Sequence, residues 1–318
     1  TEVEGIVQDA ISNAVDFVEG EISEDRIKAQ RYYDGEVDLG YEKGRSKVVA
    51  TKVRDTIRAV KPSLMRIFLS TAKPVEYVPS GPEDVAMAEQ ATEFMHHEFT
   101  RLNGYRVMND AFQDALVKKQ GIVKAYWMTY PEAEIYTFSD LSDDEYTYLL
   151  DDDDVTVIEH SVEMSIDMDE MGMAMEMPVH SVKLSRQKEK GELCIESVPP
   201  EEFFVSRDAR SLADAYIVAH RTDMRAGDLI AMGYDPEIVL NLDNFESGAD
   251  VTEVETFERR GYDVDSSDED MQDPSMLNVA VTEAYMRIDV DGTGIPVLHK
   301  ITCGGTAYEM LDYEPCDE

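Results

Sequence analysis

Apolar residues in the first third of the chain recur at intervals of three and four, the spacing of amphipathic helices. One such stripe runs through residues 3–33, where Glu19-Gly20-Glu21 is expected to end a first helix and Ser23 to begin a second. A further stripe predicts a helix with one buried face and a kink or restart at Pro62. Its apolar members are Val49, Val53, Ile57, Val60 and Leu64. Two more helices are expected between residues 85 and 116.

After Gly121 the pattern changes to short runs of β-branched and aromatic residues, which are typical of strands. The expected strands are residues 122–130, 155–158, 179–184, 193–198, 203–205, 216–220, 279–290 and 295–301. Short helices are expected at residues 224–232 and 236–242. No repeat of 20 to 50 residues is visible in the sequence. The predicted fold class is therefore α+β, with a helical first third followed by mixed, strand-rich regions.

Shifts in composition predict five parts of the chain. These are a helical part (1–130), an acidic Met-rich β insertion or hairpin (131–190), a mixed α/β core (191–245), an acidic helix or linker (246–275) and a β-hairpin region (276–318). Residues 131–182 hold sixteen Asp/Glu and no Lys or Arg. Six methionines between residues 164 and 177 are interpreted as part of a hairpin tip, with a metal-binding or peptide-binding groove as the alternative. Because the sequence starts at Thr1 and its end does not complete an element, we expect the full-length protein to continue beyond Glu318.

The formal charge of −39 limits the kinds of partner that the chain can hold. Affinity for nucleic acid comes mainly from Lys and Arg, so wrapping of DNA or RNA by this chain is implausible. An acidic chain from a salt-rich habitat is an alternative explanation of the charge. No window of 18 apolar residues and no secretory leader is visible in the sequence, which predicts no membrane association. The three cysteines, Cys194, Cys303 and Cys316, lie far apart and indicate a reducing compartment during folding.

The sequence carries none of the common catalytic or phosphate-binding motifs, neither a P-loop nor a GxGxxG or GxSxG pattern. His97-Glu98 begins a zinc-protease pattern, but Arg101 stands where the second histidine ligand would be. Asp289 and Asp291 match the first half of a calcium loop. However, Lys300 replaces the twelfth-position Glu, so a tight hairpin turn is the favoured interpretation. We therefore predict no catalytic, cofactor or metal site and no enzymatic activity.

Several dispersed segments together resemble the portal (head-to-tail connector) proteins of short-tailed bacteriophages. The segments are Tyr32-Tyr33-Asp34-Gly35, residues 44–70, Lys73-Pro74-Val75-Glu76, residues 114–124, Val198-Pro199-Pro200-Glu201-Glu202-Phe203, Ser206-Arg207-Asp208-Ala209 and residues 281–292. The resemblance implies a portal-like fold in a ring, usually dodecameric, at one capsid vertex of the virion. Such a ring forms the channel for packaging and ejection of double-stranded DNA, without sequence recognition. The acidic blocks at 135–178 and 246–275 have no counterpart in this resemblance.

The same resemblance implies partners and a place of assembly. The expected partners are the terminase large subunit, adaptor or tail proteins, and capsid and scaffolding proteins, with assembly in the host cytoplasm. Two alternatives stay open: another acidic capsid-associated adaptor or internal protein, and a calcium-binding protein that uses Asp289 and Asp291. No cofactor is implied.

The stretch of residues 43–68 differs from the rest of the chain because it holds eight Lys/Arg and one acid. The apolar spacing places these cations on the flanks of a packed helix instead of in a continuous nucleic-acid patch. We predict that Lys52, Arg54 and Arg58 oppose acids of the same or the adjacent subunit and are subunit-interface residues. Contact with DNA is the alternative.

Overall fold

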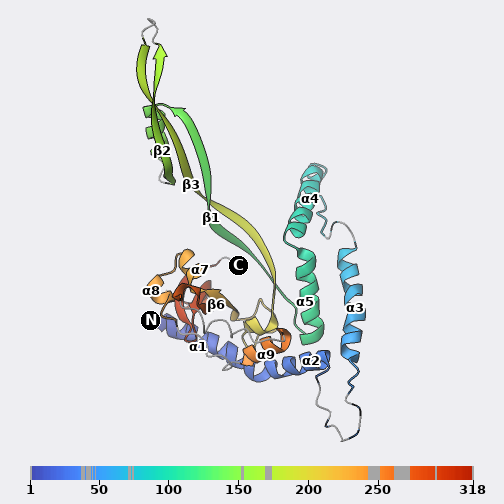
Figure 1. The fold of residues 1–318 in the computed structure, drawn as a ribbon. Helices are drawn as coiled ribbons and strands as arrows, with labels where there is room; N and C mark the ends of the chain where they lie inside the picture. The colour runs from blue at the N-terminus through green and yellow to red at the C-terminus, as the bar shows by residue number, and fades with distance from the viewer. Residues whose placement is uncertain are drawn as a thin grey trace. The chain divides into compact units, whose positions relative to one another are not determined.

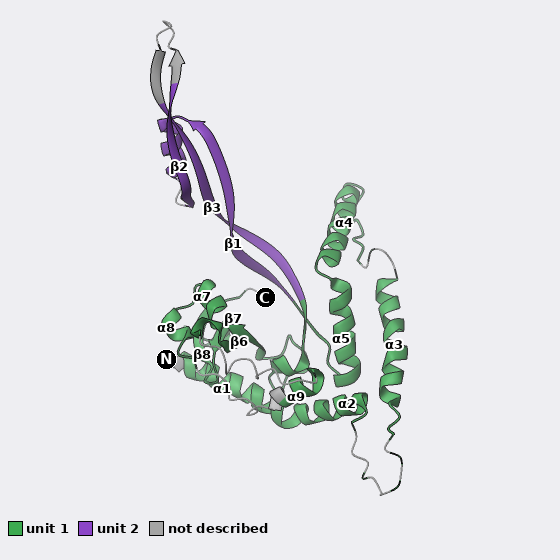
Figure 2. Cartoon of the chain, viewed as in Figure 1, with its two compact units in different colours: residues 1–124, 196–318 green, residues 125–195 purple. Residues whose placement is uncertain are grey.

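The computed structural model describes residues 2–36, 48–70, 75–151, 154–168, 174–242, 251–260, 273–290 and 292–316, together with positions 40, 44, 46 and 73. The chain divides into two compact units (Figure 2). We call residues 1–124 with 196–318 the main unit, and residues 125–195 the β unit. The finer five-part division of the sequence stays a prediction.

Helices dominate the first part of the chain and strands the remainder (Figure 1), so the α+β prediction is confirmed. The α-helices are α1 (Glu2–Phe17), α2 (Glu24–Asp34), α3 (Lys52–Leu69), α4 (Val85–Arg101), α5 (Gly104–Lys118), α6 (Asp143–Leu150), α7 (Ala226–Ala231), α8 (Pro236–Val239) and α9 (Val251–Arg260). The shorter helical turns are the π-helix η1 (Val18–Ser23) and the 3-10 helices η2 (Pro200–Glu202) and η4 (Pro274–Met276). The strands are β1 (Ile122–Leu141), β2 (Val155–Met168), β3 (Ala174–Val198), β4 (Phe203–Val205), β5 (Ile217–Arg225), β6 (Asn278–Ile288), β7 (Val297–Gly304) and β8 (Glu309–Pro315).

The core of the main unit lies between α1 and a five-stranded antiparallel sheet of order β4-β5-β6-β7-β8. Val7 and Ile11 of α1 are fully buried against the sheet, as the apolar stripe of the sequence predicted. On the sheet side they meet a layer that includes Phe204, Ile217 and Ile301. Each such side chain contributes about 1.5–3 kcal/mol by leaving water, so this layer holds the main unit together.

The opposite face of the same sheet is covered by α7 and α8. Val279 and Val281 of β6 point to this side and pack with Leu229 and Val239. The buried residues Ala284, Met286 and Ile288 of the same strand belong to the layer below α1. Side chains alternate between the two faces of a strand, so β6 contributes to both layers. This explains why apolar residues of β6 occur at both odd and even positions.

Three details of the first helices differ from the sequence prediction. Glu19-Gly20-Glu21 does not end a helix, because the chain passes through η1 into α2 with helical dihedral angles at both junctions. Helix α3 does not restart at Pro62 but continues through it, while the kink stays a prediction. Only Ile57 and Met65 of α3 are buried, and the predicted buried face is largely open. The reason is that α3 packs mainly on α5, which covers one side of it.

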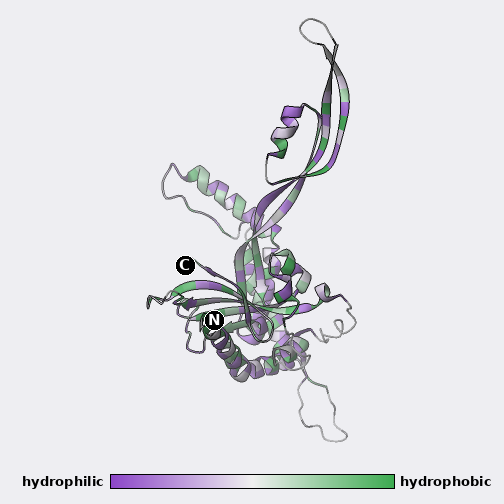
Figure 3. Ribbon diagram, turned by 90° about the vertical axis from the view of Figure 1, so that its left-hand side faces the viewer, coloured by the Kyte–Doolittle hydropathy of each residue, from purple (hydrophilic) through white to green (hydrophobic). Residues whose placement is uncertain are grey.

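The β unit is a three-stranded sheet of order β1-β3-β2 with antiparallel pairing of β2 and β3. Hydrophobic and hydrophilic residues are interleaved along its strands (Figure 3), as in a sheet with one packed face. The sequence prediction missed α6 in this unit, although Ser142 and Glu145 form a capping box at its start. The tip that carries Met171 and Met173 lies outside the described residues. Among the described helices of the chain, none is long and apolar enough to cross a membrane.

Candidate functional site

Six charged side chains from four segments of the main unit meet in its interior. Three are cations and three are carboxylates, so the formal charges balance. All but one of the side chains are at most 7% exposed, and the sixth, Arg259, is 27% exposed. We call this group the buried ion cluster; its members are Arg26, Asp114, Lys118, Glu201, Glu255 and Arg259.

Lys118 stands at the centre of the cluster. Its Nζ lies 3.0 Å from Oε2 of Glu201 and 2.9 Å from Oε1 of Glu255. Arg259 donates to Oδ2 of Asp114 at 2.8 Å and to the carboxylate of Glu201 at 3.2 Å. A buried ion pair is tolerated only when each charge has an opposite partner and good hydrogen bonds, and these four contacts meet that condition.

Arg26 closes the cluster on the α2 side. It donates to the carbonyl oxygen of Pro200 at 2.7 Å and to the side-chain oxygen of Gln120, and its Nη1 lies 3.6 Å from Oε2 of Glu255. Nε of Arg26 and Oε2 of Glu255 are buried without a hydrogen-bond partner. The Arg26–Glu255 contact is therefore an ion pair held by charge and not by a hydrogen bond.

The cluster changes the titration of its carboxylates in opposite directions. Burial alone would raise the pKa of Glu201, but the adjacent Lys118 and Arg259 outweigh it, so the pKa of Glu201 is lowered. For Asp114 burial is the larger influence and the pKa is raised, although Arg259 opposes this. Glu201 is therefore the carboxylate that the cations hold firmly in its charged form.

Local sequence explains how each segment contributes to the cluster. Asp114 and Lys118 of α5 are four residues apart and share one helix face, as do Glu255 and Arg259 of α9. Pro200 opens the 3-10 turn that turns Glu201 into the interior. The sequence analysis missed the cluster; the two pairs at i, i+4 spacing are the signal that could have suggested it.

A second ionic group lies on the sheet of the main unit. Glu283 of β6 is bound by Lys124 and, at 3.2 Å, by Lys300 of β7, and it accepts a hydrogen bond from Tyr285. Burial tends to raise the pKa of Glu283, but the two lysines lower it. Burial and the Glu283 carboxylate raise the pKa of Tyr285. This group ties the beginning of β1 to the sheet.

The three predicted interface residues of α3 have different surroundings. Arg54 donates to the carbonyl oxygens of Tyr33 and Asp34, at 3.0 and 2.6 Å. It thereby supplies hydrogen-bond donors to carbonyl groups that have no partner within the last turn of α2. The side chains of Lys52 and Arg58 are exposed and form no ion pair with another described residue. Among the described residues, therefore, Arg54 alone of the three meets an acid, at 3.4 Å from Oδ1 of Asp34.

The calcium-like segment begins a turn between the antiparallel strands β6 and β7. The carboxylate of Asp289 accepts hydrogen bonds from the backbone N–H groups of Thr293 and Gly294, at 3.0 and 2.5 Å. These hydrogen bonds lower the pKa of Asp289, and the bond from Gly294 contributes most to that shift. The carboxylate thus serves the turn itself, and Gly292 and Gly294 supply positive φ angles there. Asp291 lies outside the described residues.

In the β unit, α6 is held on the sheet by a line of hydrogen bonds. His180 Nε2 lies 2.6 Å from Oδ1 of Asp143, and His160 Nε2 lies 2.8 Å from His180 Nδ1. A carboxylate only accepts, so His180 donates to Asp143 through Nε2 and accepts from His160 through Nδ1 when neutral. The ring of Tyr146 stacks on both imidazoles, with centroids 4.4 and 4.7 Å apart.

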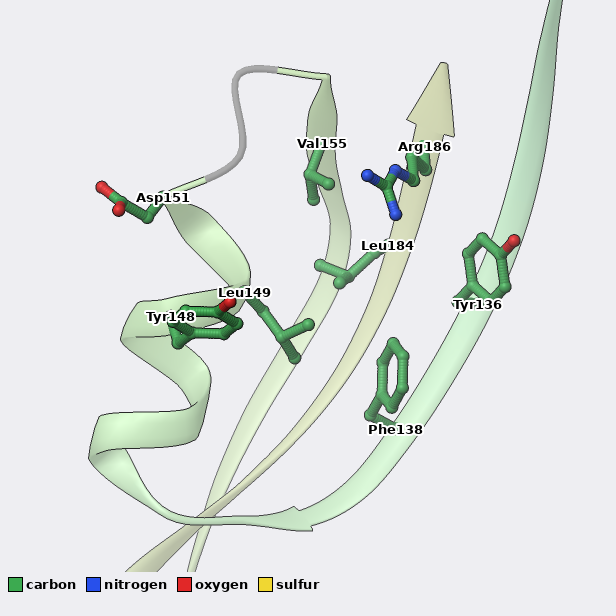
Figure 4. Close-up of a pocket in the computed structure, with 8 residues that line it drawn as sticks. All are labelled: Tyr136, Phe138, Tyr148, Leu149, Asp151, Val155, Leu184 and Arg186. Carbon is green, nitrogen blue, oxygen red and sulfur yellow. The ribbon is translucent and has the colours of Figure 1, made fainter. Parts of the chain in front are cut away.

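The β unit also contains a cavity of about 560 Å³ that is open to solvent (Figure 4). Its lining is mostly aromatic and aliphatic and includes one cation and one acid. The lining residues are Tyr136, Phe138, Tyr148, Leu149, Asp151, Val155, Leu184 and Arg186. Such a lining suits an apolar side chain better than acid–base chemistry. Among the described residues, no group of three or more His, Cys, Asp or Glu side chains could hold a metal ion.

Comparison with known proteins gives one match. The family model described as phage SU10 portal protein matches residues 3–318, nearly the whole chain. No curated protein matches the chain. This family is structural and non-enzymatic, so the portal resemblance and the prediction that the chain is not an enzyme are both confirmed.

Proposed function

The chain belongs to the phage SU10 portal protein family, and from this premise we propose that it forms a dodecameric ring at one capsid vertex. The ring is the channel through which double-stranded DNA is packaged and ejected. The observation that carries the proposal is the family match over residues 3–318. Its proposed partners are the terminase large subunit, adaptor or tail proteins, and capsid and scaffolding proteins. The ring is proposed to assemble in the host cytoplasm.

The charge of the chain supports a conduit that does not grip DNA. Asp and Glu number 68 against 29 Lys and Arg. A net-negative channel repels phosphate at every position along the duplex, so DNA can slide without a deep binding site. The buried ion cluster leaves this excess of acids unchanged, because its three cations are matched by three carboxylates.

Electron microscopy of the purified full-length protein tests the proposal. Rings with a central channel are expected in projection images, with a mass that reports the subunit number. A protein that stays monomeric in all conditions, with no ring in assembled particles, would refute the ring. Rings without a central channel would favour a different capsid-associated protein.

Lys52 and Arg58 are proposed as contacts to acids of the adjacent subunit, because both side chains are exposed and form no ion pair with another described residue. Arg54, by contrast, is proposed to act within its own subunit through Asp34. The double variant Lys52→Glu, Arg58→Glu should lose rings without losing the monomer fold. Lys28→Glu on α2, also an exposed cation, is the matched control. Normal rings combined with defective DNA packaging would instead assign these cations to DNA.

A further inference from the structure

Helix α3 carries a row of apolar side chains that the described part of the chain leaves partly exposed. Val53, Val60 and Ile67 are spaced seven residues apart and are 42%, 41% and 70% exposed. Residues seven apart lie on nearly the same side of a helix, because two turns take about 7.2 residues. The three side chains therefore form one continuous row along α3, which we call the α3 seam.

The buried side of α3 adjoins the α3 seam, because Ile57 follows Val53 by four residues and precedes Val60 by three. Ile57 and Met65 are buried, and Phe68 packs on Phe112 of α5 with ring centroids 5.5 Å apart. These contacts fix α3 against α5 and leave the α3 seam open. The amphipathic pattern of the sequence predicts burial of Val53 and Val60, which the described residues of one chain do not provide. A second surface is needed to complete the helix.

The residues beside the α3 seam favour close packing with a helix. Thr56 and Ser63, also seven apart, lie between the seam residues and are small enough to let another backbone approach. A seven-residue repeat of apolar positions is the pattern that packs side chains into holes of a neighbouring helix at a crossing angle of about 20°. The α3 seam extends over two such repeats.

Charge identifies the kind of surface that fits. Lys52 and Arg66 lie beside the α3 seam, and their exposed side chains form no ion pair with another described residue. Such cations are stabilised by an acidic partner, and each copy of this chain carries a formal charge of −39. A second copy therefore offers the complementary charge that this surface lacks in isolation.

We propose that the α3 seam is a subunit interface in which α3 packs lengthwise against a helix of a second copy. The inference rests on the proposed ring and names the surface that closes it. In a closed ring of more than two subunits the contact is heterologous, so the α3 seam meets a different surface of its neighbour. Lys52 and Arg66 set the register by facing acids on that surface.

Mass photometry of the full-length protein tests the proposal with the variant Val60→Ser, Ile67→Ser. The matched control is Leu212→Ser, Met232→Ser, which removes two apolar side chains that are 68% and 62% exposed elsewhere on the main unit. Each of the two substitutions in the α3 seam should raise the protein concentration at which half of the subunits are assembled by about tenfold. The control variant should leave this concentration unchanged. Because the α3 seam is unpacked within one chain, the melting temperature of the monomer should not change.

Photo-crosslinking adds a readout of the partner surface. A benzophenone amino acid at Val60 should give a covalent dimer whose cross-linked peptide comes from a helix of a second copy. If wild-type protein forms rings and the seam variant forms them equally well, the inference is wrong and the ring stands. If wild-type protein forms no rings, the proposed function itself fails. Cross-links confined to one chain would also overturn the inference.

Discussion

Replacing Lys118 with methionine should destabilise the main unit more than any loss of a surface charge. The substitution keeps most of the side-chain volume and removes the ammonium group. Glu201 and Glu255, which are 2% and 0% exposed, then lose their contacts at 3.0 and 2.9 Å. Breaking a buried ion pair by removing one partner costs about 3–5 kcal/mol, because it leaves an uncompensated buried charge.

The surrounding cations place the expected cost within that range. Arg259 still lies 3.2 Å from Glu201, so this carboxylate keeps one partner. Among the described residues, Glu255 keeps only Arg26, at 3.6 Å and without a hydrogen bond to Oε2. We therefore expect a loss of about 3 kcal/mol in the free energy of unfolding, with most of it due to Glu255.

Urea unfolding followed by far-UV circular dichroism measures this loss. Lys28→Met is the matched control, because Lys28 is an exposed lysine of α2, and surface changes of this kind usually cost at most about 0.5 kcal/mol. Adding Glu255→Gln to Lys118→Met should restore part of the stability by removing the unpaired charge. If Lys118→Met costs no more than Lys28→Met, the ion cluster does not stabilise the fold as argued here.

Three further predictions address the core, the sheet and α6. Ile11→Ala should lower the free energy of unfolding by about 2–5 kcal/mol, measured by urea unfolding. The control Ile6→Ala, at a position that is 48% exposed, should change it little. Equal losses for the two variants would contradict the burial of Ile11 against the sheet. The pKa of Glu283 is lowered in the folded state, so its stabilising contribution is present above its unfolded value of about 4.3 and is lost as the pH falls through the folded pKa. Urea midpoints measured from about pH 5 to about pH 3 should fall less steeply in Glu283→Gln, and parallel curves would contradict this. Ser142→Ala removes the N-terminal cap of α6 and should speed hydrogen exchange of the α6 amides about fivefold. Exchange in α1 is the internal control. Unchanged exchange in α6 would contradict the role of the cap.

The core was predictable because it depends on spacing within single elements. Val7 and Ile11 follow one helical stripe, and that stripe alone identifies the side of α1 that meets the sheet. The strand β8 was missed for the opposite reason. It is an edge strand whose side chains are mostly exposed, and acids such as Glu309 and Asp312 hide its pattern. Acidic residues on an edge also discourage pairing with another chain.

The two i, i+4 pairs could have suggested the ion cluster, but its long-range partners were not predictable, because they depend on which distant segments meet. Lys118 reaches Glu201 and Glu255 across 83 and 137 positions of the chain. With so many carboxylates in the sequence, no single one identifies itself as the partner of a given lysine. Helix α3 shows a related limit, because an apolar stripe does not identify the surface that covers it. Its pattern predicted burial of Val53 and Val60, but the structure leaves them 42% and 41% exposed.

The distribution of cations gives a physical reason why assembly of so acidic a chain can be specific. Two copies with a charge of −39 each repel one another in most orientations. Arg26, Lys118 and Arg259 are partnered within the main unit, so they do little to relieve this repulsion. Lys52 and Arg66 stand exposed beside the α3 seam, where an approaching acidic surface is attracted. Repulsion elsewhere and attraction at α3 together favour one orientation, since specificity is the difference between the intended contact and its competitors.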